Sequence, residues 1–252
     1  PTHNSERTIT RAITSVLNQT CLPREILVVD DCSTDTTVAV ISASQATSPI
    51  GIQVICLESN VGPSASRNRG WNAATSEFIA FLDSDDSWHK QKLEIQTQWM
   101  IENPRCAISG HLTGLVNSST NESKVLTRCF GLHGFLIRNR VSTPTVMVRR
   151  SIPDRFDEDM WYAEDYDLWL RIIAKYGHLT RLELPLAHLY KADYGEAGLS
   201  SRLYPMFRGE LDAVAKLRHT SEISRLTVGL TWVWMTLKFI LRTTKTAIRR
   251  HR

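Results

Sequence analysis

The sequence predicts an α/β fold in which a mostly parallel central sheet carries helices on both of its faces. Two observations point to this class. Short apolar runs alternate with helix-like stretches through the first part of the chain. Several of these runs end in acidic residues, at the strand ends where open α/β sheets bind ligands. With 252 residues, 42% hydrophobic and 22% charged, the chain can bury a full core.

The first half of the chain supplies the alternating elements. Helices are predicted at residues 5–19, 36–44 and 64–74, the first because its apolar residues fall on one helical face. Continuous apolar runs predict strands at residues 25–29, 52–57 and 78–82. A further helix is expected to begin after Trp88.

The second half is less regular. Strand candidates lie at residues 107–116, 124–130 and 144–149, with the polar run 117–123 as a turn between the first two. Leu168, Ile172 and Ile173 share one helical face, which predicts a helix at residues 162–176.

The last segment changes character. Residues 226–241 are largely apolar, are interrupted by Lys238 and lead into a basic tail. This run is short for a membrane span, which needs about 20 residues. Trp232 and Trp234 with flanking cations fit a helix that lies in a membrane interface. A helix that packs on the core or on a second subunit is the open alternative.

Charge and cysteine content limit the class of protein. The last eleven residues contribute +5 of the net charge of +4, so the rest of the chain is at about −1 and does not suit a nucleic-acid partner. The five cysteines lie far apart, without metal-type spacing, which fits a reducing compartment. We therefore expect a cytoplasmic protein, and the C-terminal segment leaves peripheral attachment to the inner face of a membrane open.

An acidic cluster follows the strand predicted at residues 78–82. Asp83, Asp85 and Asp86 stand within four residues and repel one another, and a hard divalent cation is the usual relief. Mg²⁺ or Mn²⁺ held by one or two carboxylates and by substrate phosphates is the common arrangement. A solvated acidic turn that caps the next helix is the plain structural alternative.

Several separate patterns occur in a fixed order: Pro1–Asn4, then SVLNQT at 15–20, VVDDCST at 28–34, Asn60 with Gly62, Arg67 and Asn68, FLDSDDSW at 81–88, and Glu164–Asp165 with Leu168 and Trp169. As an ordered set the chain resembles the family 2 inverting glycosyltransferases, which use nucleotide-sugars and have the GT-A fold. The resemblance implies a GT-A domain over residues 1–220, with its first strand upstream of Pro1. Residues 221–252 would form a C-terminal apolar or amphipathic helix with a basic tail.

The resemblance also implies a nucleotide site. Asp30 would accept a hydrogen bond from the imide N–H of the base, which suits uracil or thymine, with Asp31 as the second candidate, and Thr2 and Asn4 lie in the opening loop beside the base. Arg67 would reach the nucleotide or its phosphates. A second set lies in the acidic motif, where a ribose hydroxyl would contact Asp83 or Asp85 near Ser84, and Mn²⁺ or Mg²⁺ would bind Asp85 and Asp86.

Asp165 is the expected catalytic base, because an acceptor hydroxyl must lose its proton as it attacks the anomeric carbon. Glu164 would contact the acceptor or orient the site. The plain alternative for both residues is favourable negative charge at a helix N-terminus. Trp88 and Trp169 can stack on sugars, although packing is the commoner role and is favoured for Trp169.

The implied reaction moves a sugar from a nucleotide-diphosphate donor, expected to be a UDP-sugar, to a hydroxyl of a glycan or lipid-linked acceptor. A nucleotidyl- or phosphoryltransferase and a catalytically silent sugar-binding protein are the alternatives. One departure from the family pattern lies at residues 187–201, where His188 and Lys191 stand in place of a clear diphosphate-binding arginine. The oligomeric state is not predicted.

Overall fold

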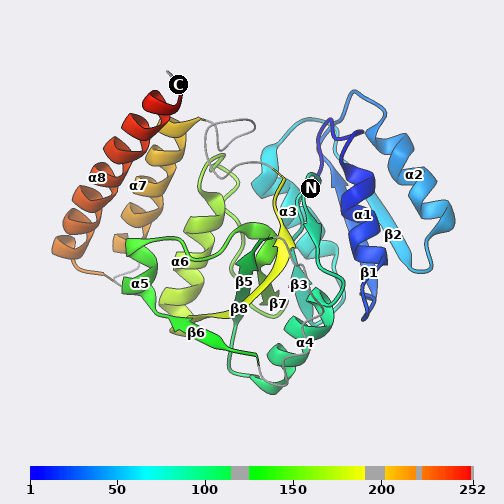
Figure 1. The fold of residues 1–252 in the computed structure, drawn as a ribbon, viewed down its shortest axis with the longest axis horizontal. Coiled ribbons are helices and arrows are strands. Elements are labelled where there is room, and N and C mark those ends of the chain that lie inside the picture. The colour runs from blue at the N-terminus through cyan, green and yellow to red at the C-terminus, as the bar shows by residue number, and fades with distance from the viewer. Residues whose placement is uncertain (115–124, 191–201, 220–222, 251–252) are drawn as a thin grey trace.

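The computed structural model describes residues 1–114, 125–190, 202–219 and 223–250, with backbone alone at residues 219 and 245–250. It confirms the α/β class. Among the described residues, a small two-stranded sheet with its helices lies at one side of the molecule, and a six-stranded sheet forms the centre (Figure 1). A pair of long helices lies on the opposite side (Figure 1).

The small sheet pairs β1 (Glu25–Asp30) with β2 (Gly51–Cys56) in parallel register. It packs with α1 (Ile9–Leu17) and α2 (Thr37–Thr47) through buried aliphatic residues, and α3 (Gly62–Ala73) contacts β1. These five elements match the sequence-based predictions to within a few residues. The apolar runs predict the positions of the two strands because strands that are covered by helices are continuously apolar.

The central sheet has the strand order β3–β7–β5–β8–β4, and β6 pairs with β8 as well. Its strands are β3 (Phe78–Ala80), β4 (Ser87–Trp88), β5 (Ile108–Thr113), β6 (Thr127–Phe130), β7 (Met147–Arg149) and β8 (Leu179–His188). Only β5 and β8 pair in parallel here. The expectation of a mostly parallel sheet therefore needs correction for the central sheet. Its other pairings are antiparallel and unite strands that are far apart in the sequence, so no local strand–helix–strand unit sets their direction.

Helices cover the central sheet and extend it. They are α4 (Lys92–Glu102), α5 (Leu132–Ile137), α6 (Glu164–Tyr176), α7 (Leu203–His219) and α8 (Arg225–Arg250). The core around α6 is aromatic, and Phe81, Phe156 and Trp169 lie with ring centroids 5.3–6.0 Å apart. Because α6 has an almost fully buried face, the position of its N-terminus is set by packing.

An apolar cavity of about 360 Å³ lies between the two sheets. Its walls include Ile26 and Val28 of β1, Phe78 and Ala80 of β3, and Ile13 of α1. In the described residues β1 pairs with β2 and β3 with β7, so β1 and β3 are not hydrogen-bonded to each other. The strand expected upstream of Pro1 stays a prediction.

The C-terminal segment is helical from Arg225 to Arg250, nine residues longer than its apolar run at the C-terminal end. No helix among the described residues combines the length and the apolar content that crossing a bilayer requires. All five cysteines are free thiols, and Cys106 is the buried one.

Candidate functional site

Arg67 of α3 joins the two acidic motifs. Its Nη1 donates to Glu164 Oε1 at 2.7 Å and its Nη2 donates to Asp83 Oδ1 at 2.8 Å. The Arg67 side chain is 6% exposed, and that of Asp83 is 30% exposed. Burial lowers the pKa of Arg67, but Asp83 and Glu164 outweigh this and raise it above its ordinary value. One guanidinium thus brings the end of β3 to the N-terminus of α6.

Asp165 lies in the first turn of α6. The residue before this helix is Ala163, whose φ of 56° is left-handed. Its Oδ1 accepts from the Tyr166 backbone N–H at 2.7 Å, and its Oδ2 accepts from Thr143 Oγ1 at 3.3 Å. Burial and then the charge of Glu164 raise the pKa of Asp165 to about 7, against the opposing effect of Arg67. This carboxyl group is therefore suited to exchange a proton near neutral pH.

The acidic loop after β3 is tied to the opening loop of the chain. Ser84 Oγ and Ser5 Oγ lie 2.8 Å apart, and the Asp86 N–H donates to the Asp83 carbonyl at 3.1 Å. Arg11 of α1 donates to the carbonyl oxygen of Asp85. These contacts fix the loop from both sides.

Asp85 and Asp86 differ in their surroundings. Asp86 is buried, and its Oδ1 accepts from the Tyr190 N–H at 3.4 Å, whereas Asp85 is partly exposed. Within the described parts of the chain, no three His, Cys, Asp or Glu side chains gather as a metal cluster. Two adjacent carboxylates fit a hard cation whose other ligands are water and substrate phosphate, as Mg²⁺ prefers.

Both acidic residues at the end of β1 are buried and already hydrogen-bonded. Asp30 accepts from the Ser33 N–H at 3.0 Å and from Ser33 Oγ at 2.6 Å. Asp31 accepts from the N–H groups of Val61 and Gly62 at 2.8 and 2.9 Å, so it caps the start of α3. Asp31 therefore has a structural task that sequence reasoning did not identify.

The opening loop lies alongside the end of β1. The Thr2 N–H donates to the Val29 carbonyl at 2.8 Å, and Thr2 is buried. Asn4 is exposed with a φ of 48°, and its Oδ1 accepts from the Thr34 N–H at 2.8 Å. Thr2 forms a parallel bridge with Asp30, and Ser33 Oγ accepts from the Asn4 N–H and donates to Asp30. Their role in nucleotide binding stays a prediction.

Two further predictions can be located. Trp88 and Trp169 are both buried, and Trp88 Nε1 donates to the Pro144 carbonyl at 2.7 Å, so both tryptophans pack in the core. His188 ends β8 and contacts the ring of Tyr190. Lys191 and the rest of the segment to residue 201 lie outside the described residues.

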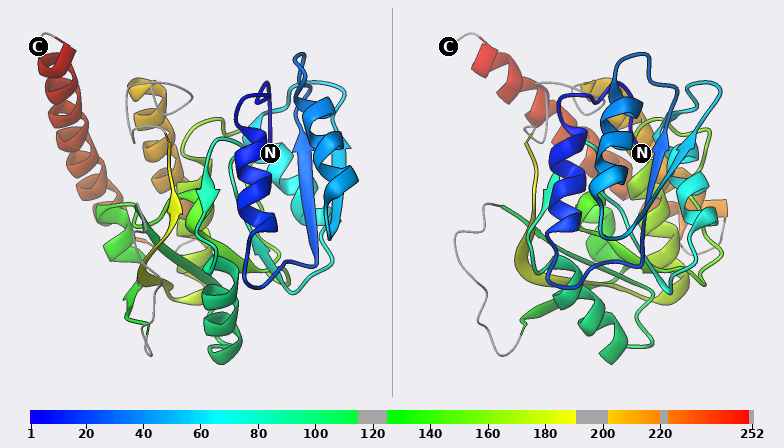
Figure 2. Two further views of the ribbon diagram at one scale, coloured as in Figure 1. Left: turned by 45° about the vertical axis from the view of Figure 1, so that its right-hand side comes forward. Right: turned by 90° about the vertical axis from the view of Figure 1, so that its right-hand side faces the viewer.

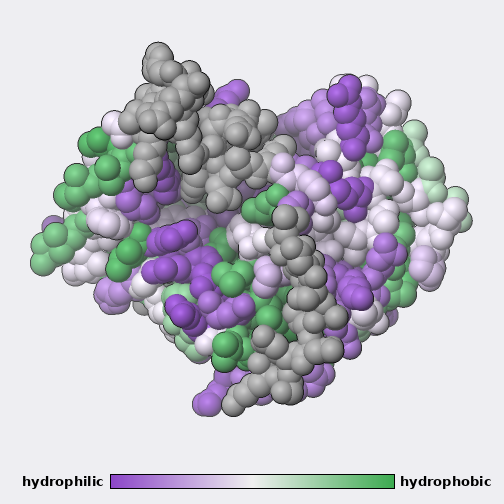
Figure 3. All heavy atoms as spheres, viewed as in Figure 1, coloured by the Kyte–Doolittle hydropathy of each residue, from purple (hydrophilic) through white to green (hydrophobic). Residues whose placement is uncertain are grey.

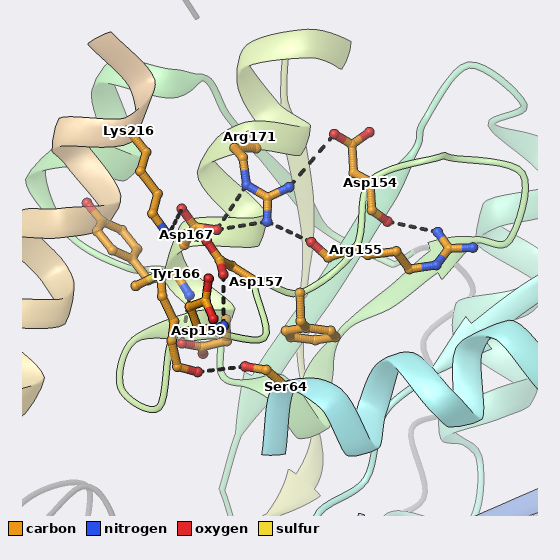
Figure 4. A network of polar contacts seen from close by, with 12 residues as sticks. Ser64, Asp154, Arg155, Asp157, Asp159, Tyr166, Asp167, Arg171 and Lys216 are labelled. Atoms are coloured by element: carbon orange, nitrogen blue, oxygen red, sulfur yellow. Dashed lines mark hydrogen bonds and ion pairs between the residues drawn. The ribbon is translucent and has the colours of Figure 1, made fainter. Parts of the chain in front are cut away.

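A second charged network occupies the next turn of the same helix (Figure 4). Asp167, which is fully buried, accepts from Arg171 at 2.7 Å and lies 4.0 Å from Lys216 of α7. Lys216 also pairs with Asp157, and Arg171 lies 4.0 Å from Asp154. This network joins α6, α7 and the 154–159 loop, and no sequence pattern marked it.

Comparison with known proteins gives a consistent family. The family model described as glycosyl transferase family 2 matches residues 1–152. The Escherichia coli protein UDP-Glc:alpha-D-GlcNAc-diphosphoundecaprenol beta-1,3-glucosyltransferase WfgD is 34% identical over 69% of this chain and 67% of its own length. The putative teichuronic acid biosynthesis glycosyltransferase TuaG of Bacillus subtilis is 39% identical over 43% of this chain and 42% of its own.

Solved structures are similar over most of the chain. The S. aureus TarS fragment 1–349 in complex with UDP-GlcNAc has a TM-score of 0.69 at 23% identity and covers 86% of this chain and 64% of its own. The mannosyltransferase PcManGT from Pyrobaculum calidifontis, in complex with GDP-Man and Mn²⁺, has a TM-score of 0.67 at 15% identity. It covers 100% of this chain and 79% of its own. At these identities the likeness is one of fold.

Proposed function

This chain belongs to glycosyl transferase family 2, and from that premise we propose that it transfers a sugar from a UDP-sugar to a hydroxyl group with inversion. The acceptor in this proposal is a glycan or a lipid-linked sugar. The observation that carries it is the Arg67 bridge, because it brings the acidic loop at Asp83 and the helix that bears Asp165 into one site. The expected GT-A fold agrees with the solved structures that the chain resembles.

The printed descriptions of the relatives support the choice of donor and acceptor. WfgD is described as using UDP-Glc and a GlcNAc-diphosphoundecaprenol acceptor, and the TarS structure contains UDP-GlcNAc. A cytoplasmic location is part of the same proposal, supported by five unpaired cysteines.

The donor would lie across the ends of β1 and β3. Asp30 and the Thr2 loop would hold the base, while Asp83 and Ser84 would face the ribose. Asp85 and Asp86 would hold Mn²⁺ or Mg²⁺, which when bound neutralises charge on the diphosphate. Arg67 keeps Asp83 and Glu164 in place through hydrogen bonds that leave its guanidinium inside the site.

The chemical step needs one base. The acceptor oxygen forms a bond to the anomeric carbon as the bond from that carbon to the phosphate oxygen breaks, and the nucleoside diphosphate leaves. The acceptor's proton passes to the Asp165 carboxylate, whose pKa of about 7 matches a base that works near neutral pH. Glu164, held by Arg67, positions this turn of the helix. A carboxyl group tuned in this way disfavours the catalytically silent alternative.

The test replaces the base without changing its shape. Asp165→Asn should lower turnover by about 10²–10⁴-fold. It should leave the thermal shift produced by a UDP-sugar with Mn²⁺ unchanged, since the donor contacts remain. Asp159→Asn is the matched control, because Asp159 is an exposed carboxylate in the preceding loop. A panel of nucleotide-sugars identifies the donor first. Unchanged turnover in Asp165→Asn would remove the proposed mechanism.

A further inference from the structure

Helix α8 has one face that packs against the body of the protein. Val228 and Met235 are buried on this face, and Phe239 stacks on Phe207 of α7 with ring centroids 4.5 Å apart. Trp234 Nε1 donates to the Ile137 carbonyl at the end of α5 at 2.9 Å. The helix is therefore held in a fixed orientation by both α5 and α7.

The opposite face of α8 is also apolar but is exposed. Its side chains recur every three or four residues and are each 50–73% exposed: Leu226, Leu230, Val233, Leu237, Ile240 and Leu241. We call these six residues the α8 stripe. At 1.5 Å per residue it runs for about 22 Å. Figure 3 shows apolar side chains gathered along this edge of the molecule, and Figure 2 shows α8 standing at its outer side.

The charge of this helix narrows the choice of partner. From Arg225 to Arg252 the sequence contains no acidic residue, while its cations are Arg225, Lys238, Arg242, Lys245, Arg249, Arg250 and Arg252. Lys238 donates to the Ile137 carbonyl and Arg242 pairs with Glu210 of α7, so these two cations are bonded to the body of the protein. The apolar stripe together with the other five cations is complementary to an apolar layer edged with negative charge. A second copy of α8 would bring the same positive charges together, which disfavours self-pairing through the stripe.

We propose that the α8 stripe docks on the surface of a lipid bilayer that contains anionic lipids. The stripe enters the boundary between head groups and acyl chains, and the cations other than Lys238 and Arg242 meet the lipid phosphates. The docking on the bilayer does not depend on the proposed reaction.

The experiment measures co-sedimentation of the full chain with vesicles of phosphatidylcholine, with and without phosphatidylglycerol. The stripe variant Leu230→Gln/Val233→Gln/Leu237→Gln should bind anionic vesicles at least about tenfold more weakly than the parent chain. The matched control Leu22→Gln/Ile101→Gln/Leu126→Gln removes three exposed apolar side chains elsewhere and should bind normally. Val233→Gln alone should give a partial loss, which keeps the test open if the triple variant melts early.

Three outcomes would overturn the proposal. Equal binding by the parent chain and the stripe variant would exclude the stripe, and equal binding to neutral and anionic vesicles would exclude the role of charge. A parent chain that forms dimers, binds no vesicles and becomes monomeric in the stripe variant would assign the stripe to self-association. Vesicle binding is read without any transfer assay, so its failure is distinct from failure of the proposed function.

Discussion

Helix α6 carries two charged networks within one turn of each other, and they differ in how far their carboxylates are exposed to solvent. At its N-terminus Arg67 joins Asp83 and Glu164, Asp83 stays 30% exposed, and Asp165 beside it has a raised pKa. Three residues after Glu164, Asp167 is fully buried, accepts from Arg171 at 2.7 Å through Oδ2 and lies 4.0 Å from Lys216 through Oδ1, which has no hydrogen-bond partner among the described residues.

The difference separates chemistry from stability. A buried ion network whose partners all lie in the protein ties elements together, and removing one partner leaves an uncompensated charge. A network that leaves a carboxyl group partly exposed and shifted toward neutral pKa is a candidate for catalysis. The two networks use the same residue types, so only their surroundings distinguish them.

The largest expected effect comes from making the same substitution in both networks. Arg67→Gln should lower transfer at least about 100-fold, because a cation inside the proposed site is lost and Glu164 is released. Arg171→Gln should lower the free energy of unfolding by about 3–5 kcal/mol, because it leaves the buried Asp167 without its ion-pair partner, and should leave turnover per folded molecule unchanged. Initial rates corrected for the folded fraction, together with denaturant melts, give both quantities. A hundredfold loss of rate in Arg171→Gln at unchanged stability would break the comparison.

The second prediction concerns pH. The folded pKa of Asp165 is about 7, above the ordinary value of about 3.9, so its contribution to stability is present at low pH and is lost as the pH rises toward 7. In the network around Asp167, burial alone would raise the pKa of Asp157, but Lys216 holds it below its ordinary value. The contribution of Asp157 to stability is therefore lost as the pH falls. The rate should rise with pH to a plateau above about pH 7.

Melting temperatures measured from about pH 2 to pH 8 test this pair of signs, because the Asp157 contribution is lost below the ordinary pKa of about 3.9. Asp165→Asn should remove the part of the decline that lies between pH 4 and pH 7. Asp157→Asn should instead flatten the loss on the acid side. An unchanged profile in Asp165→Asn would contradict the raised pKa.

The smallest expected effect tests whether α7 helps to position the N-terminus of α6, where Glu164 and Asp165 lie. A Cβ added at Gly209 of α7 would lie 2.3 Å from the Tyr162 carbonyl, next to the left-handed Ala163 that precedes Glu164. Gly209→Ala should therefore lower kcat a few-fold and the free energy of unfolding by about 1–3 kcal/mol. Gly229→Ala in α8, where nothing lies within 4 Å of the added Cβ, is the control and should be neutral or stabilising. A variant at Gly209 that behaves like the control would show that α7 does not position the site.

Much of the fold follows from local sequence. The first helices and strands were predicted because each apolar run is local and is covered by helices. Strand β8 was not predicted, although it pairs with β4, β5 and β6. Its run contains charged residues and Pro185, beside which the register with β5 shifts, so no simple period is visible. Strand direction in the central sheet was also not readable, because its antiparallel pairs unite strands that are far apart in the sequence.

The candidate site was predicted as two separate motifs. Spacing identifies Asp83–Asp86 and Glu164–Asp165 because each is a compact cluster at an element end. The Arg67 bridge between them spans 97 residues from Arg67 to Glu164, and such pairings leave no local pattern. The capping role of Asp31 was missed for the same reason, since its partners Val61 and Gly62 contribute backbone groups that every residue has.

The cavity between β1 and β3 has a mechanical consequence. Asp30 ends one sheet and Asp83 follows a strand of the other, so a molecule that grips both braces the two halves against each other. The rise in melting temperature on binding of a nucleotide-sugar would then reflect the linking of the two sheets as well as the affinity for the ligand. A further strand bound between β1 and β3 would link the two sheets permanently.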